Sequence, residues 1–183
     1  MSQKTSLFKK RDKHASAATP KLLHVGPEAC LEERFRASLG EGYLSADLHN
    51  PIAMTSFDVC EIPHKDQSFD AIYCSHILEH VQDDVKAMRE FHRVLKTDGW
   101  AILLVPISAK KTIEDPTITD PKERLRLYGQ EDHVRRYGPD YVDRLRGAGF
   151  NVGTFKVSDL VTHDEAIKMG LEKTRGRIVF CTK

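Results

Sequence analysis

The chain has 183 residues, of which 40% are hydrophobic and 30% charged, and its formal net charge is +1. This length suits one domain with a full hydrophobic core. The near-neutral charge argues against a nucleic-acid partner, because neutralising a phosphate backbone requires a clustered basic surface. The sequence has no apolar run near the roughly 20 residues that span a bilayer, so we expect no membrane partner.

The cysteines and the N-terminus indicate the compartment. The four cysteines are widely separated and form no CxxC pair: Cys30, Cys60, Cys74 and Cys181. This spacing favours reduced thiols over disulfides or a zinc site. The N-terminus lacks the apolar core of a signal peptide. We therefore expect a cytoplasmic protein. We also expect it to be a monomer or a homodimer.

Polarity divides the chain into two parts. Residues 1–20 are polar and basic, which predicts a flexible leader; a phosphate- or partner-binding arm is the alternative. Residues 21–183 are expected to form a single domain. Within it, residues 107–137 are charged and too long for a simple connector. Insertions of this kind are often lids or binding loops, so we expect a lid there.

Strands and helices alternate through the rest of the sequence, which is typical of an α/β fold with a mostly parallel sheet. The helices are predicted from apolar residues at helical spacing, such as Leu31, Phe35 and Leu39. They cover about residues 28–39, 83–95, 138–149 and 164–171. The predicted strands cover residues 22–25, 43–46, 54–57, 68–74, 100–105, 150–157 and 177–182.

The first two predicted strands end at Gly26 and Asp47. Their separation is close to the ~20 residues expected between a glycine turn and an acid that binds a ribose. Glycine lets the backbone approach a ligand, and a carboxylate can accept hydrogen bonds from both ribose hydroxyls. A purely structural turn explains Gly26 equally well.

The residues after Gly26 indicate which nucleotide cofactor the turn could bind. The other glycines of a dinucleotide fingerprint are missing, and three glutamates follow: Glu28, Glu32 and Glu33. Their charge would repel the pyrophosphate of NAD or FAD at a helix N-terminus. S-adenosylmethionine, which carries a sulfonium and an amino-acid end, fits better.

Four segments resemble the class I S-adenosylmethionine-dependent methyltransferases. They are HVGPEAC (24–30), YLSAD (43–47), DVCEIPHKDQSFDAIYCSHILEHVQD (58–83) and FHRVLKTDGWAILLVP (91–106). The resemblance implies a Rossmann-like three-layer sandwich whose seven-stranded sheet is mostly parallel, with one antiparallel strand. The first motif departs from the family, because His24 replaces its usual acid and only Gly26 of its glycines remains.

The resemblance also implies roles for particular residues. Gly26 would lie beside the cofactor, Asp47 would hold its ribose, and Asp58 would face the adenine amino group. The remaining cofactor contacts would come from Val59, Cys74 and Ser75. An ordinary turn or capping aspartate is the alternative for Asp47 and for Asp58.

His76 and His80 are the candidate proton acceptors, because they follow the strand end where the methyl donor would sit. Their i, i+4 spacing places both on one face if the segment is helical. The alternative is that His80 packs under the loop and His76 only shapes the pocket. HILEH is not the HExxH pattern of zinc proteases, and although His133 is a possible third ligand, we expect no metal site.

The predicted lid contains His133, Arg135 and Tyr137, which are candidate substrate-binding residues. Arginine could clamp a carboxylate or phosphate there. The interspersed acids make a solvated charged face the alternative. We expect a methyltransferase acting on an oxygen, nitrogen or carbon of a small molecule. A catalytically inactive binding or regulatory protein of the same fold is the first alternative, and a nucleotide-dependent oxidoreductase is the second.

Overall fold

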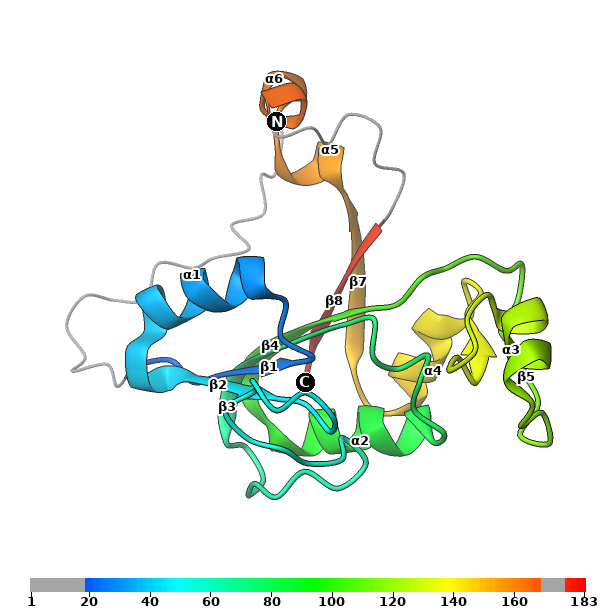
Figure 1. The fold of residues 1–183 in the computed structure, drawn as a ribbon. Coiled ribbons are helices and arrows are strands. Elements are labelled where there is room, and N and C mark those ends of the chain that lie inside the picture. Colours follow the sequence, from blue (N-terminus) through cyan, green and yellow to red (C-terminus); the bar gives the residue numbers. More distant parts are fainter. Residues whose placement is uncertain (1–18, 169–176) are drawn as a thin grey trace.

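The computed structural model describes residues 19–168 and 177–183 (Figure 1). Nearly all of the predicted leader, residues 1–18, and the end of the predicted helix 164–171 lie outside the described residues. Within them, that helix covers His163–Lys168 (α6) and follows a short helix at Val157–Leu160 (α5).

A six-stranded sheet in the order β2-β1-β3-β4-β8-β7 forms the centre of the fold. Neighbours among the first four strands are parallel, and β8 runs antiparallel to both β4 and β7. The α/β class and the single antiparallel strand are therefore confirmed. The strands are Leu22–Val25 (β1), Tyr43–Ala46 (β2), Phe69–Ser75 (β3), Leu95–Leu104 (β4), Asn151–Lys156 (β7) and Arg177–Thr182 (β8).

The predicted count of seven strands is too high by one. Residues 54–57 contribute only an isolated parallel bridge, between Thr55 and Ala46 at the edge of the sheet. Thr55 donates its N–H to Ser45 O and accepts from Asp47 N. The flanking Met54 and Ser56 are exposed. Phe57, the last residue of the segment, is buried in the core without strand pairing, so the segment buries its apolar side chain without joining the sheet further.

Helices cover both faces of the sheet, which confirms the three-layer arrangement. Asp84–Val94 (α2) and Tyr141–Gly147 (α4) bury apolar side chains in the main core, together with sheet residues such as Leu23 and Ile72. Ala29–Leu39 (α1), followed by a 3-10 turn at Gly40–Gly42, covers the other face with Phe35 and Leu39. Figure 1 shows α1 and α2 on opposite sides of the strands. The sheet face under α2 and α4 carries the larger cluster of buried apolar residues.

The segment predicted as a lid has its own small elements. Ile113–Glu114 (β5) pairs antiparallel with Arg135–Arg136 (β6), and a helix at Pro121–Tyr128 (α3) lies between them in sequence. Figure 1 shows this segment beside α4. Side chains of its second half reach into the body of the domain, so it is anchored there.

The loop that precedes β3 is tied to α2 by one ion-pair group. The Arg93 guanidinium donates to the Ile62 and His64 carbonyls and to the carboxylates of Asp66 and Glu90. Glu90 Oε2 also accepts the Ile62 N–H at 2.9 Å. Hydrogen bonds from Arg93 lower the pKa of Glu90, although burial opposes this.

That depressed pKa predicts an acid-sensitive contribution from Glu90. A group whose pKa is lower in the folded state stabilises the fold fully above its unfolded value, about 4.3, and less as pH falls through the folded value. Glu90→Gln should cost about 1.5–3 kcal/mol at pH 7, the range for hydrogen bonds to charged groups. In urea unfolding, the gap between wild type and variant should narrow as pH falls below about 4.3. The exposed Glu33→Gln is the control; a pH-independent gap for Glu90→Gln would contradict the assignment.

Candidate functional site

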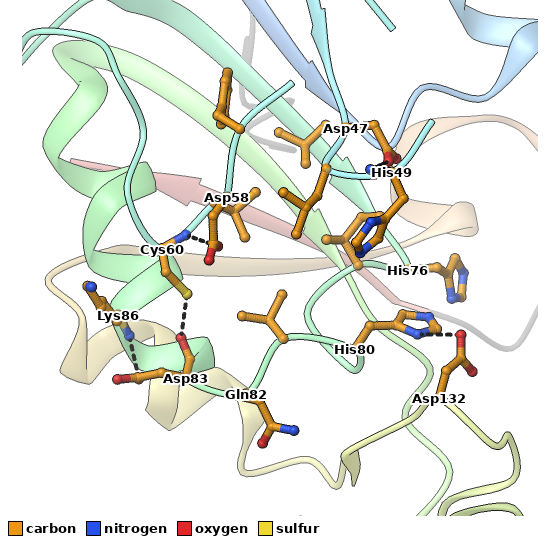
Figure 2. A pocket seen from close by; sticks show the side chains of 16 residues that line it. Asp47, His49, Asp58, Cys60, His76, His80, Gln82, Asp83, Lys86 and Asp132 are labelled. Atoms are coloured by element: carbon orange, nitrogen blue, oxygen red, sulfur yellow. Dashed lines mark hydrogen bonds and ion pairs between the residues drawn. The ribbon is translucent and has the colours of Figure 1, made fainter. Parts of the chain in front are cut away.

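A cavity of about 690 Å³ lies where β1, β2 and β3 end (Figure 2). Val25 is the last residue of β1, and Asp47 directly follows β2. Five of the residues expected from the sequence line this cavity: Asp47, Asp58, Val59, His76 and His80. Ligands of open parallel sheets bind outside the carboxyl ends of the strands, so this is the expected position.

Gly26 forms the turn beside the cavity. Its φ is +63°, and an added Cβ would lie 2.4 Å from Ile77 Cδ1. Its N–H donates to the Ala46 carbonyl at 2.9 Å, which holds the ends of β1 and β2 together. The backbone angle therefore favours glycine here, while the close approach means that a larger residue would displace the Ile77 side chain.

Only one of the two oxygens of the Asp47 carboxylate accepts hydrogen bonds within the described residues. Oδ1 accepts the backbone N–H groups of His49 and Asn50, each at 2.8 Å, which makes Asp47 a turn residue. Oδ2 accepts no hydrogen bond from any residue that the structure describes, and the side chain lines the cavity. The turn therefore orients the carboxylate and leaves one oxygen for a ligand.

Asp58 and Val59 form another part of the wall, together with Cys60. Asp58 Oδ1 accepts the Cys60 N–H at 2.7 Å, and Val59 is buried. The Cys60 thiol donates to the Asp83 carbonyl at 3.4 Å. Burial, with the Asp58 charge nearby, raises the pKa of this thiol to about 11. The thiol therefore stays neutral at physiological pH and is a poor nucleophile.

Cys74 and Ser75 do not line the cavity. Both are buried within β3, and Cys74 belongs to the main core. Burial raises the pKa of the Cys74 thiol above its ordinary range. Strand alternation explains the placement of Cys74, since it puts this side chain on the face under α2.

His76 and His80 approach the cavity from a turn, so the condition of a helical segment is not met. His76 has a positive φ of 57°, which few non-glycine residues adopt, and the His80 N–H donates to Ile77 O at 2.9 Å. The two imidazoles still line the same cavity (Figure 2). Their Nδ1 atoms lie 3.2 Å from Glu79 Oε1 and 3.1 Å from Asp132 Oδ2, respectively. Strained backbone of this kind gathers at functional sites.

A second cavity of about 330 Å³ adjoins the first and shares His76 and His80 with it. His133 lines this second chamber, along with residues from the start and middle of the predicted lid, such as Ser108 and Gln130. Sequence reasoning missed the chamber, because its walls come from segments far apart in the chain.

Arg135 and Tyr137 line neither cavity, unlike the substrate clamp suggested by the sequence. Both are buried. The Arg135 guanidinium donates to the carbonyls of Leu78, Val81 and Gln82. It therefore holds the turn that carries Glu79 and His80, and its donors are already occupied.

Tyr137 belongs to a charge cluster, defined by Asp84, Glu114, Arg135, Tyr137 and Arg144, in which Asp84, Arg135 and Tyr137 are buried. The Tyr137 hydroxyl donates to Asp84 Oδ2 at 2.6 Å, and Arg144 donates to both Asp84 oxygens, at 2.5 and 2.9 Å. Burial alone would raise the pKa of Glu114, but hydrogen bonds from Arg135 and Arg144 outweigh it and lower that pKa. The cluster docks the predicted lid onto α2 and α4.

His24 is fully buried under α1, where its ring contacts Phe35. Its Nδ1 lies 2.9 Å from the Tyr43 hydroxyl, and its Nε2 lies 2.7 Å from Glu28 Oε2. Glu28 is the residue before α1, and its side chain makes no cap of the helix. The histidine thus fixes the acidic start of α1 beside the Gly26 turn.

Comparison with known proteins finds similarity to methyltransferases. A family model described as "Methyltransferase domain" matches residues 27–103. The chain is 40% identical to the uncharacterized methyltransferase YcgJ of Bacillus subtilis over an aligned segment of 74 residues. This segment covers 40% of the length of this chain and 28% of the length of that protein. The matched segment thus spans less than a third of this curated relative.

Solved structures extend the likeness to most of the chain. The YcgJ crystal structure superposes with a TM-score of 0.56 at 20% identity, covering 90% of this chain and 88% of that one. A Burkholderia thailandensis 1,6-didemethyltoxoflavin-N1-methyltransferase with bound 1,6-didemethyltoxoflavin and S-adenosylhomocysteine has a TM-score of 0.57 at 16% identity, covering 90% and 71%. At such identities the likeness concerns the fold. No helix among the described residues is long and apolar enough to cross a membrane.

Proposed function

We propose that this chain, whose residues 27–103 match a methyltransferase domain model and whose fold is similar to that of known methyltransferases, transfers a methyl group from S-adenosylmethionine to a small molecule. One observation carries this proposal. The residues that the family resemblance assigns to the ribose and the adenine, Asp47, Asp58 and Val59, line a single cavity at the ends of β1, β2 and β3, and His76 and His80 line the same cavity.

The cavity residues fit this cofactor. Asp47 has a free carboxylate oxygen for the ribose hydroxyls, and Asp58 and Val59 offer a polar and an apolar contact for the adenine. The volume of about 690 Å³ is in the range of small-ligand and cofactor sites. A pyrophosphate would meet Glu28 and a turn with one glycine, which disfavours NAD and FAD.

The second chamber is our candidate for the acceptor. Its volume of about 330 Å³ suits a small molecule rather than a polymer, and it meets the first cavity at His76 and His80. The cofactor, when bound, supplies a methyl group on a sulfonium, which an acceptor atom displaces in line. Positioning of the acceptor supplies most of the acceleration. His76, whose side chain is 63% exposed, is placed to take a proton from an acceptor that must lose one.

Calorimetric titration with S-adenosylmethionine, S-adenosylhomocysteine and NAD tests the cofactor assignment. We expect both adenosyl ligands to bind and NAD not to bind. No binding of either adenosyl ligand well above a micromolar concentration range would overturn the proposal. Methyl-transfer assays with a metabolite panel then separate an enzyme from an inactive binding protein, which would bind the cofactor without transferring its methyl group.

Asp47 provides the sharper test. Asp47→Ala should weaken S-adenosylhomocysteine binding by about 1–3 kcal/mol, because the ribose would lose a charged hydrogen-bond acceptor. Asp47→Asn is the matched variant, since its amide oxygen can still accept the His49 and Asn50 N–H groups and preserve the turn. If Asn binds like wild type while Ala does not, Asp47 acts through the turn alone. If both bind like wild type, the ribose assignment is wrong.

A further inference from the structure

Three potential metal ligands converge between the two cavities. One donor atom each from Glu79, His80 and His133 lies within 4.8 Å of the other two. Glu79 and His133 are buried, and the His80 side chain is 34% exposed, so the group opens toward the chambers on one side. The His80 and His133 rings meet edge to face, with centroids 4.6 Å apart.

An unsatisfied atom marks this group as more than a packing cluster. Glu79 Oε2 is buried and has no hydrogen-bond partner, and it is the one buried side-chain oxygen or nitrogen in that state among the described residues. Leaving such an oxygen unpaired costs about 1–3 kcal/mol or more for a charged group. A bound cation would satisfy it.

Each histidine has a partner at Nδ1, which leaves its Nε2 available for a ligand. His80 Nδ1 lies 3.1 Å from Asp132 Oδ2, and His133 Nδ1 lies 3.3 Å from the Tyr128 carbonyl, which can only accept. Nδ1 of His133 is therefore the protonated nitrogen, and Nε2 keeps its lone pair. Partners of this kind fix the tautomer of most metal-bound histidines. Arg135 adds rigidity by holding the Leu78 and Val81 carbonyls on either side of Glu79 and His80.

We propose that Glu79, His80 and His133 bind a divalent transition-metal ion at the boundary of the two chambers. Two imidazoles and one carboxylate suit Zn²⁺ or Fe²⁺ better than Mg²⁺, and three protein ligands leave a position for another molecule. Zinc ligands at about 2.0–2.1 Å lie roughly 3.4 Å apart, so any donors that lie as far apart as 4.8 Å would move closer on binding.

The proposal differs from the expectation of no metal site. That expectation compared HILEH with a helical HExxH motif, but the segment folds as a turn, so helical spacing does not apply to it. A turn directs Glu79 and His80 toward His133, which approaches from 53 residues further along the chain.

The open position points to an acceptor that bears a hydroxyl group, an inference that rests on the proposed function. Binding to the metal lowers the pKa of such a hydroxyl, as it does that of water. Its proton would pass to His76, and the freed electron pair would form the O–CH₃ bond as the S–CH₃ bond breaks. S-adenosylhomocysteine would leave as the neutral sulfide. Metal binding itself does not depend on this chemistry.

Titration of the chelator-treated full chain with Zn²⁺ tests the site. We expect one ion per chain, and an affinity at least tenfold weaker in Glu79→Gln, His80→Gln and His133→Gln. Zn²⁺ should raise the melting temperature of wild type but not of Glu79→Gln, because an ion that binds only the native state stabilises it. His163→Gln, at an exposed histidine in α6, is the matched control and should bind like wild type.

The site is absent if wild type shows no Zn²⁺ binding up to about 100 μM, or if Glu79→Gln and His80→Gln bind as tightly as wild type. His80 is partly exposed, so its variant should fold even if the buried His133→Gln does not. S-adenosylhomocysteine titration of the same samples separates the two proposals. Cofactor binding without zinc would overturn only the metal site, and zinc binding without the cofactor would overturn only the methyltransferase assignment.

Discussion

Asp84→Ala is expected to destabilise the fold by about 3–5 kcal/mol, the range for removing one partner of a buried ion pair. The Asp84 side chain is 2% exposed and accepts hydrogen bonds from Arg144 and from the Tyr137 hydroxyl. Arg135 Nε lies 3.7 Å from the same carboxylate. Its loss removes the closest acceptor of the Arg144 guanidinium and of the buried Tyr137 hydroxyl, which among the described residues keep only Glu114 and, at 3.3 Å, the Leu78 carbonyl. Urea unfolding at neutral pH measures the change.

The exposed pair of Asp143 and Arg146 is the matched control. Its N···O distance is 3.1 Å, but its side chains are 75% and 56% exposed. Surface pairs contribute roughly 0–1 kcal/mol, so Asp143→Ala should be close to wild type. Similar losses in the two variants would mean that the charge cluster does not anchor the predicted lid.

Asp84→Ala should also affect the proposed metal site, because Arg135 links Asp84 to the turn that carries two of its ligands. Tyr137 and Arg144 hold Asp84, and Arg135 joins Asp84 to the carbonyls of the turn that carries Glu79 and His80. Loosening this turn should weaken Zn²⁺ binding more than cofactor binding, because Asp47 and Asp58 lie on other loops. Equal losses of both ligands would indicate general unfolding instead.

Local sequence pattern predicted the parts of the fold that depend on local interactions. Buried strands at 22–25 and 43–46, and the acid that follows the second of them, depend on nearby residues alone, and all three predictions agree with the structure. The strand at 54–57 was overpredicted, because a short run with some β-forming residues cannot reveal that its flanks remain in solvent.

The roles of side chains in the predicted lid could not be predicted from local sequence pattern. An arginine in a charged segment looks the same in sequence whether it faces solvent, a substrate or a buried carbonyl. Arg135 faces carbonyls more than 50 residues away along the chain, and only the tertiary fold brings them together. His133 had been noted as a possible ligand, but its approach to Glu79 depends on the same long-range packing.

Gly26→Ala is the second substitution with a large expected effect. Its φ of +63° would impose about 1–3 kcal/mol of backbone strain on alanine. The new Cβ, 2.4 Å from Ile77 Cδ1, would add roughly 1–3 kcal/mol of overpacking. Ile77 lines the cofactor cavity, so its displacement should also weaken S-adenosylhomocysteine binding by about tenfold or more, equivalent to at least about 1.4 kcal/mol.

Gly40→Ala separates strain from the close approach. Gly40 also has a positive φ, +50°, but an added Cβ there would meet no atom within 4 Å. It follows α1 at the end away from the cavity, so its variant should lose stability through strain alone and bind the cofactor like wild type. Urea unfolding and calorimetry of both variants give the comparison. If Gly26→Ala loses stability but keeps full affinity, Gly26 is only a structural turn, and the single glycine of the first motif has no part in the cofactor site.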